Sequence, residues 1–155
     1  MDLLQDGRQE IRALAVSSDG STLVAATTDA HVHCWRAANA ADGAGSMWKA
    51  GGSFHAHVDY ITRMHISPDS KLLCTTSADK TAKLWRTEDL AHQTTLAQHM
   101  RWVWDCAFSA DSAYVVTASS DNTAKLWEAA SGEALRCYVG HALSVTAVAL
   151  NDKSD

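Results

Sequence analysis

The 155-residue sequence lacks several features, and each absence excludes a class of protein. It has no cluster of Lys and Arg, and 13 basic against 18 acidic residues give a net charge of −5, so nucleic acid is not expected as a partner. No apolar run approaches the length of a membrane span, which argues against direct membrane insertion. Met1–Glu10 lack the basic and apolar regions of a signal peptide. The first expectation is therefore a soluble protein that does not bind nucleic acid.

Cysteine is scarce and widely spaced. No Cys-x-x-Cys pair occurs, so neither a redox motif nor a zinc ribbon is expected. Thiols far apart in a chain without a signal peptide favour a reducing, cytoplasmic compartment. We expect these residues to act as small core groups: Cys34, Cys74, Cys106 and Cys137.

What the sequence does contain is an internal repeat. Ser67–Trp85 (SPDSKLLCTTSADKTAKLW) returns 42 residues later as Ser109–Trp127 (SADSAYVVTASSDNTAKLW). An earlier copy, Ser17–Trp35, is offset by 50 residues from the middle one, and the extra eight residues fall in an Ala/Gly-rich stretch, AANAADGAGS, that predicts a surface loop. A period just above 40 residues is typical of arrays in which each copy is one structural unit.

Each copy carries the same pattern of predicted strands. Counted from a His, apolar residues fall at plus four, plus seven and plus nine, which predicts strands at 61–66, 103–108 and 145–150, with 11–16 in the same register. The change in spacing from three to two predicts a β-bulge. A turn, a second strand, a tight turn at an Asp and a third strand ending at Trp follow. Weaker fourth strands are expected near Gln93–Ala97 and Ala134–Tyr138.

The period and the Trp at the end of each copy resemble the WD-repeat family over nearly the whole chain. The resemblance implies an all-β fold, a β-propeller fragment of about three four-stranded antiparallel blades plus one extra innermost strand. The expected repeats within residues 1–155 are 8–54, 55–97, 98–138 and the first strand of a further blade, 141–150. The carboxy end then looks natural for such a chain, and the amino end looks truncated.

Two copies also contain residues that could suggest a hydrolase. A Ser, a His, an Asp and a Trp recur with the blade period, in the sets His57, Ser77, Asp79, Trp85 and His99, Ser119, Asp121, Trp127. A catalytic site would occur once, beside an oxyanion hole, and would not need an indole. The WD-repeat resemblance implies instead a buried hydrogen-bond chain from Trp to Ser to His to Asp. We therefore expect structural tetrads, no catalytic residues and no cofactor. An enzyme would require that changing Asp79 or Asp121 abolish an activity while the fold survives.

The first copy departs from this pattern. It has Thr27, Asp29 and Trp35, but Gly7 stands where the His belongs, so this blade is expected to be the least well anchored. Two His-x-His pairs, His31/His33 and His55/His57, could each place two imidazoles on one face of a strand. No third or fourth ligand is arranged nearby, so no metal site is predicted.

Candidate contact residues are large side chains at positions that the repeat leaves free. Trp102 and Trp104 flank the core position Val103 at the start of an innermost strand, and Arg101 precedes them. Two Trp and an Arg match the composition of interface hot spots. Tyr60, which corresponds to Trp102 one blade earlier, and Arg63 of the same segment are the next candidates. The alternative is that the indoles simply pack between blades.

A narrower resemblance concerns RWVWDCAFSADSAYVVTASSDNTAKLW and GEALRCYVGHALSVTAVALND, within a match from Ile11 to Asp152. These runs resemble the WD-repeat subunit of target-of-rapamycin (TOR) kinase complexes, in which Trp102 and Trp104 match a pair of tryptophans. The resemblance implies a seven-bladed, non-catalytic scaffold, present in both TOR complexes, that binds and stabilises the kinase domain. The implied partners are the TOR catalytic region and other complex subunits, with peripheral association with endomembranes through the kinase. The alternative is a generic WD-repeat adaptor, such as a ubiquitin-ligase or peptide-reading scaffold.

Overall fold

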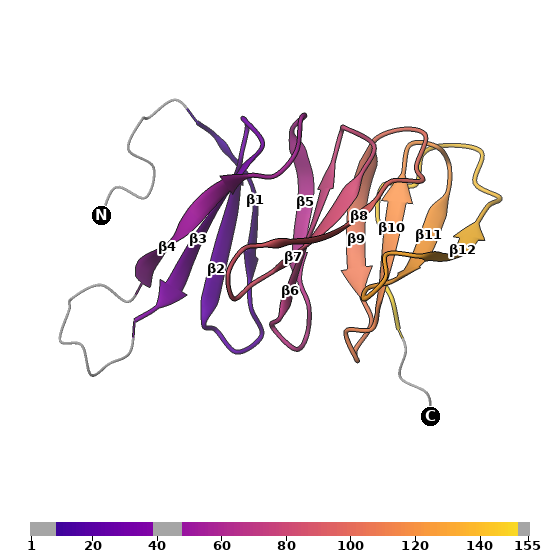
Figure 1. The fold of residues 1–155 in the computed structure, drawn as a ribbon. Helices are drawn as coiled ribbons and strands as arrows, with labels where there is room; N and C mark the ends of the chain where they lie inside the picture. Colours follow the sequence, from indigo (N-terminus) through magenta and orange to yellow (C-terminus); the bar gives the residue numbers. More distant parts are fainter. Residues whose placement is uncertain (1–8, 39–47, 152–155) are drawn as a thin grey trace.

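A computed structural model describes residues 9–38 and 48–151, and it contains three four-stranded antiparallel sheets arranged side by side (Figure 1). The all-β prediction is confirmed. Among the described residues, no helix is long and apolar enough to cross a membrane. Each sheet is one blade, with its strands in chain order. Blade 1 is β1 (Ile11–Val16), β2 (Thr22–Thr27), β3 (His31–Ala37) and β4 (Trp48–His55); blade 2 is β5 (Ile61–Ile66), β6 (Leu72–Ser77), β7 (Ala82–Arg86) and β8 (His92–Leu96); blade 3 is β9 (Val103–Phe108), β10 (Tyr114–Ser119), β11 (Ala124–Glu128) and β12 (Ala134–Tyr138).

The innermost strands of the blades are β1, β5 and β9. They begin and end at the predicted residues, and β5 packs between β1 and β9. The predicted bulge is present in all three, because the pairing register shifts between Ile11 and Ala13, between Ile61 and Arg63, and opposite Ala118 and Ser119 in β10. The bulge bends the start of each strand. We call the end of the blades where these strands begin the upper end, and the opposite end the lower end.

The second strands, β2, β6 and β10, are buried along almost their whole length. Strands covered on both faces carry continuous runs of apolar and small residues instead of a simple alternation. Two clusters of buried side chains form the core. One joins blades 1 and 2 through Val32, Cys34, Ile61, Met64, Leu73 and Trp85, and the other joins blades 2 and 3 through Leu84, Leu96, Val103, Cys106, Val115 and Trp127. The three cysteines within the core are free thiols, whereas Cys137 is exposed.

Side-chain hydrogen bonds stabilise the turns at the lower end of the blades. After each innermost strand a Ser hydroxyl donates to an Asp two residues later, at 2.5–2.6 Å, in the pairs Ser17–Asp19, Ser67–Asp69 and Ser109–Asp111. The residue directly after each Asp lies in the turn and has a positive φ. After Asp19 this residue is Gly20, with a φ of 69°. The same Asp oxygens accept backbone N–H groups of the following residues, so each turn satisfies its own polar groups.

The segment after β12 forms no strand among the described residues. It passes over the upper end of blade 3 and descends toward the carboxy terminus (Figure 1). The Val145 N–H donates to the Ser119 carbonyl at 3.1 Å, and the Val148 N–H donates to the Asp105 carboxylate at 3.1 Å. That residues 141–150 form the first strand of a further blade therefore remains a prediction. Gly7 and most of the expected Ala/Gly-rich loop lie outside the described residues.

Candidate protein-interaction surface

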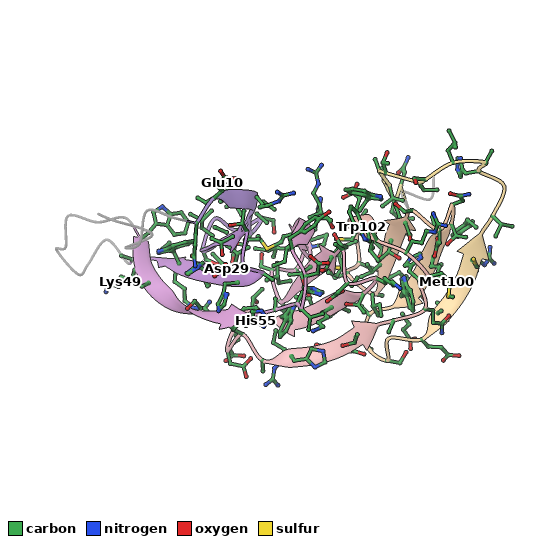
Figure 2. The ribbon with its side chains drawn as sticks, turned by 90° about the horizontal axis from the view of Figure 1, so that it is seen from above. Glu10, Asp29, Lys49, His55, Met100 and Trp102 are labelled. Atoms are coloured by element: carbon green, nitrogen blue, oxygen red, sulfur yellow. The ribbon has the colours of Figure 1, made fainter. Side chains whose placement is uncertain are left out.

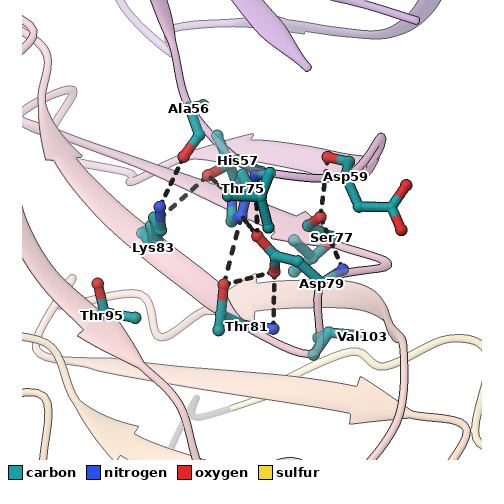
Figure 3. A network of polar contacts seen from close by, with 12 residues as sticks. Ala56, His57, Asp59, Thr75, Ser77, Asp79, Thr81, Lys83, Thr95 and Val103 are labelled. Carbon is teal, nitrogen blue, oxygen red and sulfur yellow. Dashed lines mark hydrogen bonds and ion pairs between the residues drawn. The ribbon is translucent and has the colours of Figure 1, made fainter. Parts of the chain in front are cut away.

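A buried hydrogen-bond chain crosses blades 2 and 3. In blade 3 the Trp127 indole N–H donates to Thr117 Oγ1 at 2.8 Å, Thr117 Oγ1 lies 2.7 Å from His99 Nε2, and His99 Nδ1 lies 2.8 Å from Asp121 Oδ2. Blade 2 repeats the chain with Trp85, Thr75, His57 and Asp79 at 2.9, 2.7 and 2.8 Å. Figure 3 shows its part from Thr75 through His57 to Asp79. Two strands and two loops are thereby tied together in each blade.

The chain has one consistent arrangement of protons. The indole can only donate, so the Thr hydroxyl accepts from it and donates its own hydrogen to Nε2 of the His. Nδ1–H of the His then donates to the Asp, which fixes a neutral imidazole in one tautomer. In agreement, burial lowers the pKa of His99, although Asp121 opposes the shift. Burial works against ionisation of Asp79, but hydrogen bonds from His57 and Thr81 outweigh it and hold the pKa of Asp79 well below its ordinary value.

The hydroxyl group in each hydrogen-bond chain belongs to a Thr, so the prediction of a Ser at this place is wrong. Thr75 and Thr117 occupy the place expected for Ser77 and Ser119. Residues 75 and 77 are two apart on one strand and share a face, so the pattern alone does not distinguish them. Thr75 is the nearer one along β6 to Leu73, the partner of Trp85 across the ladder, whereas Ser77 ends the strand.

The two serines anchor the loops that enter the next strands. Ser119 Oγ donates to the Arg101 carbonyl at 3.2 Å, and Ser77 Oγ donates to the carbonyls of Asp59 and Tyr60 at 3.1 and 3.0 Å (Figure 3). Both serines are fully buried and their hydroxyl groups donate to backbone carbonyls and not to a His, so these two sets lack the hydrogen bond that a Ser-His-Asp nucleophile needs. Their geometry supports a structural role.

The same network positions the loop that carries the predicted contact residues. The Met100 N–H donates to Asp121 Oδ2 at 3.0 Å, and the Ser120 N–H donates to the Trp102 carbonyl at 2.9 Å. The Trp104 indole N–H donates to Ser120 Oγ at 2.5 Å. The backbone of residues 100–102 is therefore fixed by hydrogen bonds from the second strand and the β10–β11 turn.

An aromatic strip runs across the upper end. The Trp102 ring meets the Tyr60 ring edge-on at 5.5 Å and the Trp104 ring at 5.5 Å, and the Arg12 guanidinium lies 4.8 Å from the Tyr60 ring centre. Figure 2 looks down on this end and labels Trp102 and Met100. Because Arg12 belongs to blade 1, Tyr60 to blade 2 and Trp102 to blade 3, the strip links all three blades.

The five predicted contact residues do not share one environment. Trp102 is 42% exposed and Arg101 is exposed, whereas Tyr60 and Trp104 are half-buried within the strip. The Arg63 side chain is 59% exposed, and its Nε is 3.4 Å from Asp105 Oδ1 of blade 3. The structure thus brings Tyr60, Trp102 and Trp104 together. Arg63 instead forms an ion pair with Asp105 that links two innermost strands, β5 and β9. The Trp102 indole packs against Tyr60 of the neighbouring blade and is still partly open to solvent, whereas Trp104 packs on Trp102 within its own blade.

Sequence reasoning missed other exposed apolar residues at this end. Val58 is 87% exposed and Met100 is 76% exposed, and each directly follows the network His of its blade. Leu143, two residues after His141, is also exposed. Aligning the copies and asking which loop positions carry apolar residues would have found them, because the repeat does not require them for its core. Met100 and Trp102 line the same hollow, so exposed apolar side chains adjoin there.

The His-x-His pairs lie in two different environments. His31 and His55 face each other across β3 and β4 with ring centres 4.9 Å apart, but His57 is committed to the buried chain. Among residues 9–38 and 48–151 no group of three or more His, Cys, Asp or Glu side chains could hold a metal ion.

Comparisons with known proteins agree with this architecture. The family described as "WD domain, G-beta repeat" matches residues 4–36, 48–86 and 91–128. "Target of rapamycin complex subunit LST8" of Saccharomyces cerevisiae is 48% identical over 143 residues, and "Protein LST8 homolog" of Drosophila pseudoobscura pseudoobscura is 45% identical over 143 residues. Both alignments cover 92% of this chain but only 46% and 45% of the relatives, so the chain spans about half their length.

A solved structure supports the fold alone. "Structure of U3-55K" superposes with a TM-score of 0.77 over 88% of this chain and 41% of that chain, at 22% sequence identity. Such a similarity at low identity indicates a shared architecture of blades and carries nothing about partners.

Proposed function

The chain belongs to the WD-repeat family, and from this premise we propose that it is a non-catalytic scaffold subunit of a TOR complex. The identity of 45–48% to relatives named as LST8 proteins supports the assignment to this kind of complex. We further propose that the chain binds and stabilises the kinase domain, in both TOR complexes. The compartment expected for this role is the cytoplasm.

The exposed aromatic side chain at the upper end supports the binding role. Trp102 is a large apolar side chain held in one orientation by Tyr60 and Trp104, and it still exposes 42% of its surface. A pre-positioned Trp with an Arg beside it is the usual anchor of a protein interface. Arg101 supplies that neighbour, and the anchored loop keeps both in place.

The test is binding of the full-length protein to the purified kinase region of TOR. Trp102→Ala combined with Trp104→Ala should weaken binding at least about tenfold, which corresponds to about 1.4 kcal/mol. Trp102→Phe with Trp104→Phe keeps an aromatic strip and should lose less. Thermal melting of both variants controls for folding. A double alanine variant with native melting and native kinase association would contradict this surface assignment.

A further inference from the structure

A hollow of about 400 Å³ opens at the upper end between blades 2 and 3. It is lined by Lys80, Met100, Arg101, Trp102 and Ser120. Lys80 comes from the β6–β7 turn of blade 2, and the other four come from blade 3. The hollow therefore exists only where two blades meet, beside the aromatic strip.

Lys80 and Arg101 stand out by their charge. Both side chains are exposed, and neither forms an ion pair or a side-chain hydrogen bond within the described parts of the chain. Several other basic side chains are engaged. Arg63 pairs with Asp105, Lys71 with Asp69, Arg86 with Asp89, Lys83 with the Ala56 carbonyl, and Arg36 with the carbonyls of Thr87 and Glu88. Two free cations on one hollow of a chain with a net charge of −5 mark a local site for an anion.

The walls of the hollow restrict what kind of anion fits. Met100 and Trp102 line the hollow with exposed apolar surface. A nucleic-acid backbone would cover that surface with charge and would be repelled by the rest of the molecule. A protein segment with a carboxylate next to an apolar side chain satisfies both the cations and the apolar wall.

We infer that this hollow receives an acidic segment of the partner protein, with an Asp or Glu carboxylate between Lys80 and Arg101 and an adjacent apolar side chain on Met100 and Trp102. Lys80 offers three ammonium donors and Arg101 a planar fork of donors. Ser120 Oγ already accepts the Trp104 indole N–H, so its own hydrogen is available to the same carboxylate. This inference rests on the proposed function and specifies the chemistry of the partner at that surface.

The experiment measures the dissociation constant between the full-length protein and the purified TOR kinase region at low and high NaCl. Lys80→Gln with Arg101→Gln should weaken binding about tenfold or more at low salt and should flatten the dependence on salt. The matched control is Lys71→Gln with Arg86→Gln, the same change of charge at the lower end, and it should change binding by less than about twofold. Lys80→Arg with Arg101→Lys retains both charges and should retain most of the affinity.

The outcomes separate the two proposals. If the unaltered protein does not bind the kinase region, the proposed function and this inference both fall. If it binds, and the glutamine pair binds equally well with the same salt dependence, the acidic-segment inference is wrong while the proposed function stands. Treating the kinase region with phosphatase identifies a phosphate as the anion if binding is then lost, and that result also overturns the carboxylate assignment.

Discussion

Blade 1 and blade 3 have the same four-strand topology but different interiors. Blade 3 contains the complete chain from Trp127 to Asp121, whereas blade 1 has Ala25 at the position of Thr117. Trp35 is nevertheless buried, and the ladder of β2 with β3 is as regular as that of β10 with β11. Strand pairing and apolar burial therefore suffice to build a blade. The hydrogen-bond chain has another task, which is to fix the loop and turn at the upper end.

Polar groups in blade 1 find other partners. Asp29 accepts from Thr27 Oγ1 and Gln9 Nε2, both at 2.5 Å, and lies 3.1 Å from His31 Nδ1. His33 stacks on Trp35 with ring centres 6.1 Å apart, and its Nε2 is buried without a hydrogen-bond partner among the described residues. Burial, reinforced by the neighbouring His31, lowers the pKa of His33. The expectation that blade 1 is the least well anchored remains a prediction, and the following changes test it.

Trp127→Ala should produce the largest loss. This side chain is 1% exposed and belongs to the cluster between blades 2 and 3, so its removal should lower the free energy of unfolding by about 3–5 kcal/mol. Trp35 lies outside both described inter-blade clusters. Trp35→Ala should therefore lower the free energy of unfolding less than Trp127→Ala does. The difference should be at least about 1 kcal/mol, the value of the hydrogen bond that Trp127 donates to Thr117. Urea denaturation of the two variants measures both. Equal losses would remove the distinction between the blades.

Thr117→Val makes blade 3 resemble blade 1 at a single position. The substitution keeps the volume but leaves the Trp127 N–H and His99 Nε2 without their shared partner, which should cost about 2–3 kcal/mol. The unfolding free energy measured by urea denaturation checks the value. A loss below about 0.5 kcal/mol would show that the hydroxyl is dispensable and that the chain does not stabilise blade 3.

Asp121→Ala should cost about 1–3 kcal/mol, because it leaves His99 and the Met100 N–H unpaired in a site where the Asp side chain is only 9% exposed. Asp29 is 36% exposed and its partners can turn to water, so Asp29→Ala should cost less than about 1 kcal/mol. Thermal melting of the pair gives the comparison. Amide hydrogen exchange should also show faster exchange at Met100 in Asp121→Ala but not in Asp29→Ala.

Acid should produce the smallest effect. The pKa of His99 and that of His33 are lowered by burial, so the unfolded chain binds more protons than the folded chain as the pH approaches the ordinary value of about 6.5. Stability from these residues is thus complete above that value and decreases as the pH falls below it. The melting temperature should stay level from about pH 8 to about 6.5 and decline toward about pH 5. His99→Gln should flatten this profile, and an unchanged slope would rule out a contribution from His99.

The repeat predicted the strands well because it repeats their geometry. The limits 61–66 and 103–108 are those observed, and the bulge follows from the change in apolar spacing. The choice between Thr75 and Ser77 failed because a strand pattern gives the face of a side chain but not which of two hydroxyls on that face meets the indole. The hollow that Lys80 and Met100 line was also missed, since a hollow between blades depends on how two repeats pack and not on either repeat alone.

Asp121 has a consequence for the kinetics of recognition. Its carboxylate accepts hydrogen bonds from His99 and the Met100 N–H, while Ser119 and Ser120 hold the next two residues by their carbonyls. A loop already fixed in this way gives up little conformational entropy when a partner docks. At the proposed binding surface, association then needs no slow rearrangement, and substitutions in Trp102 should act mainly on how long the complex lasts, through the dissociation rate constant.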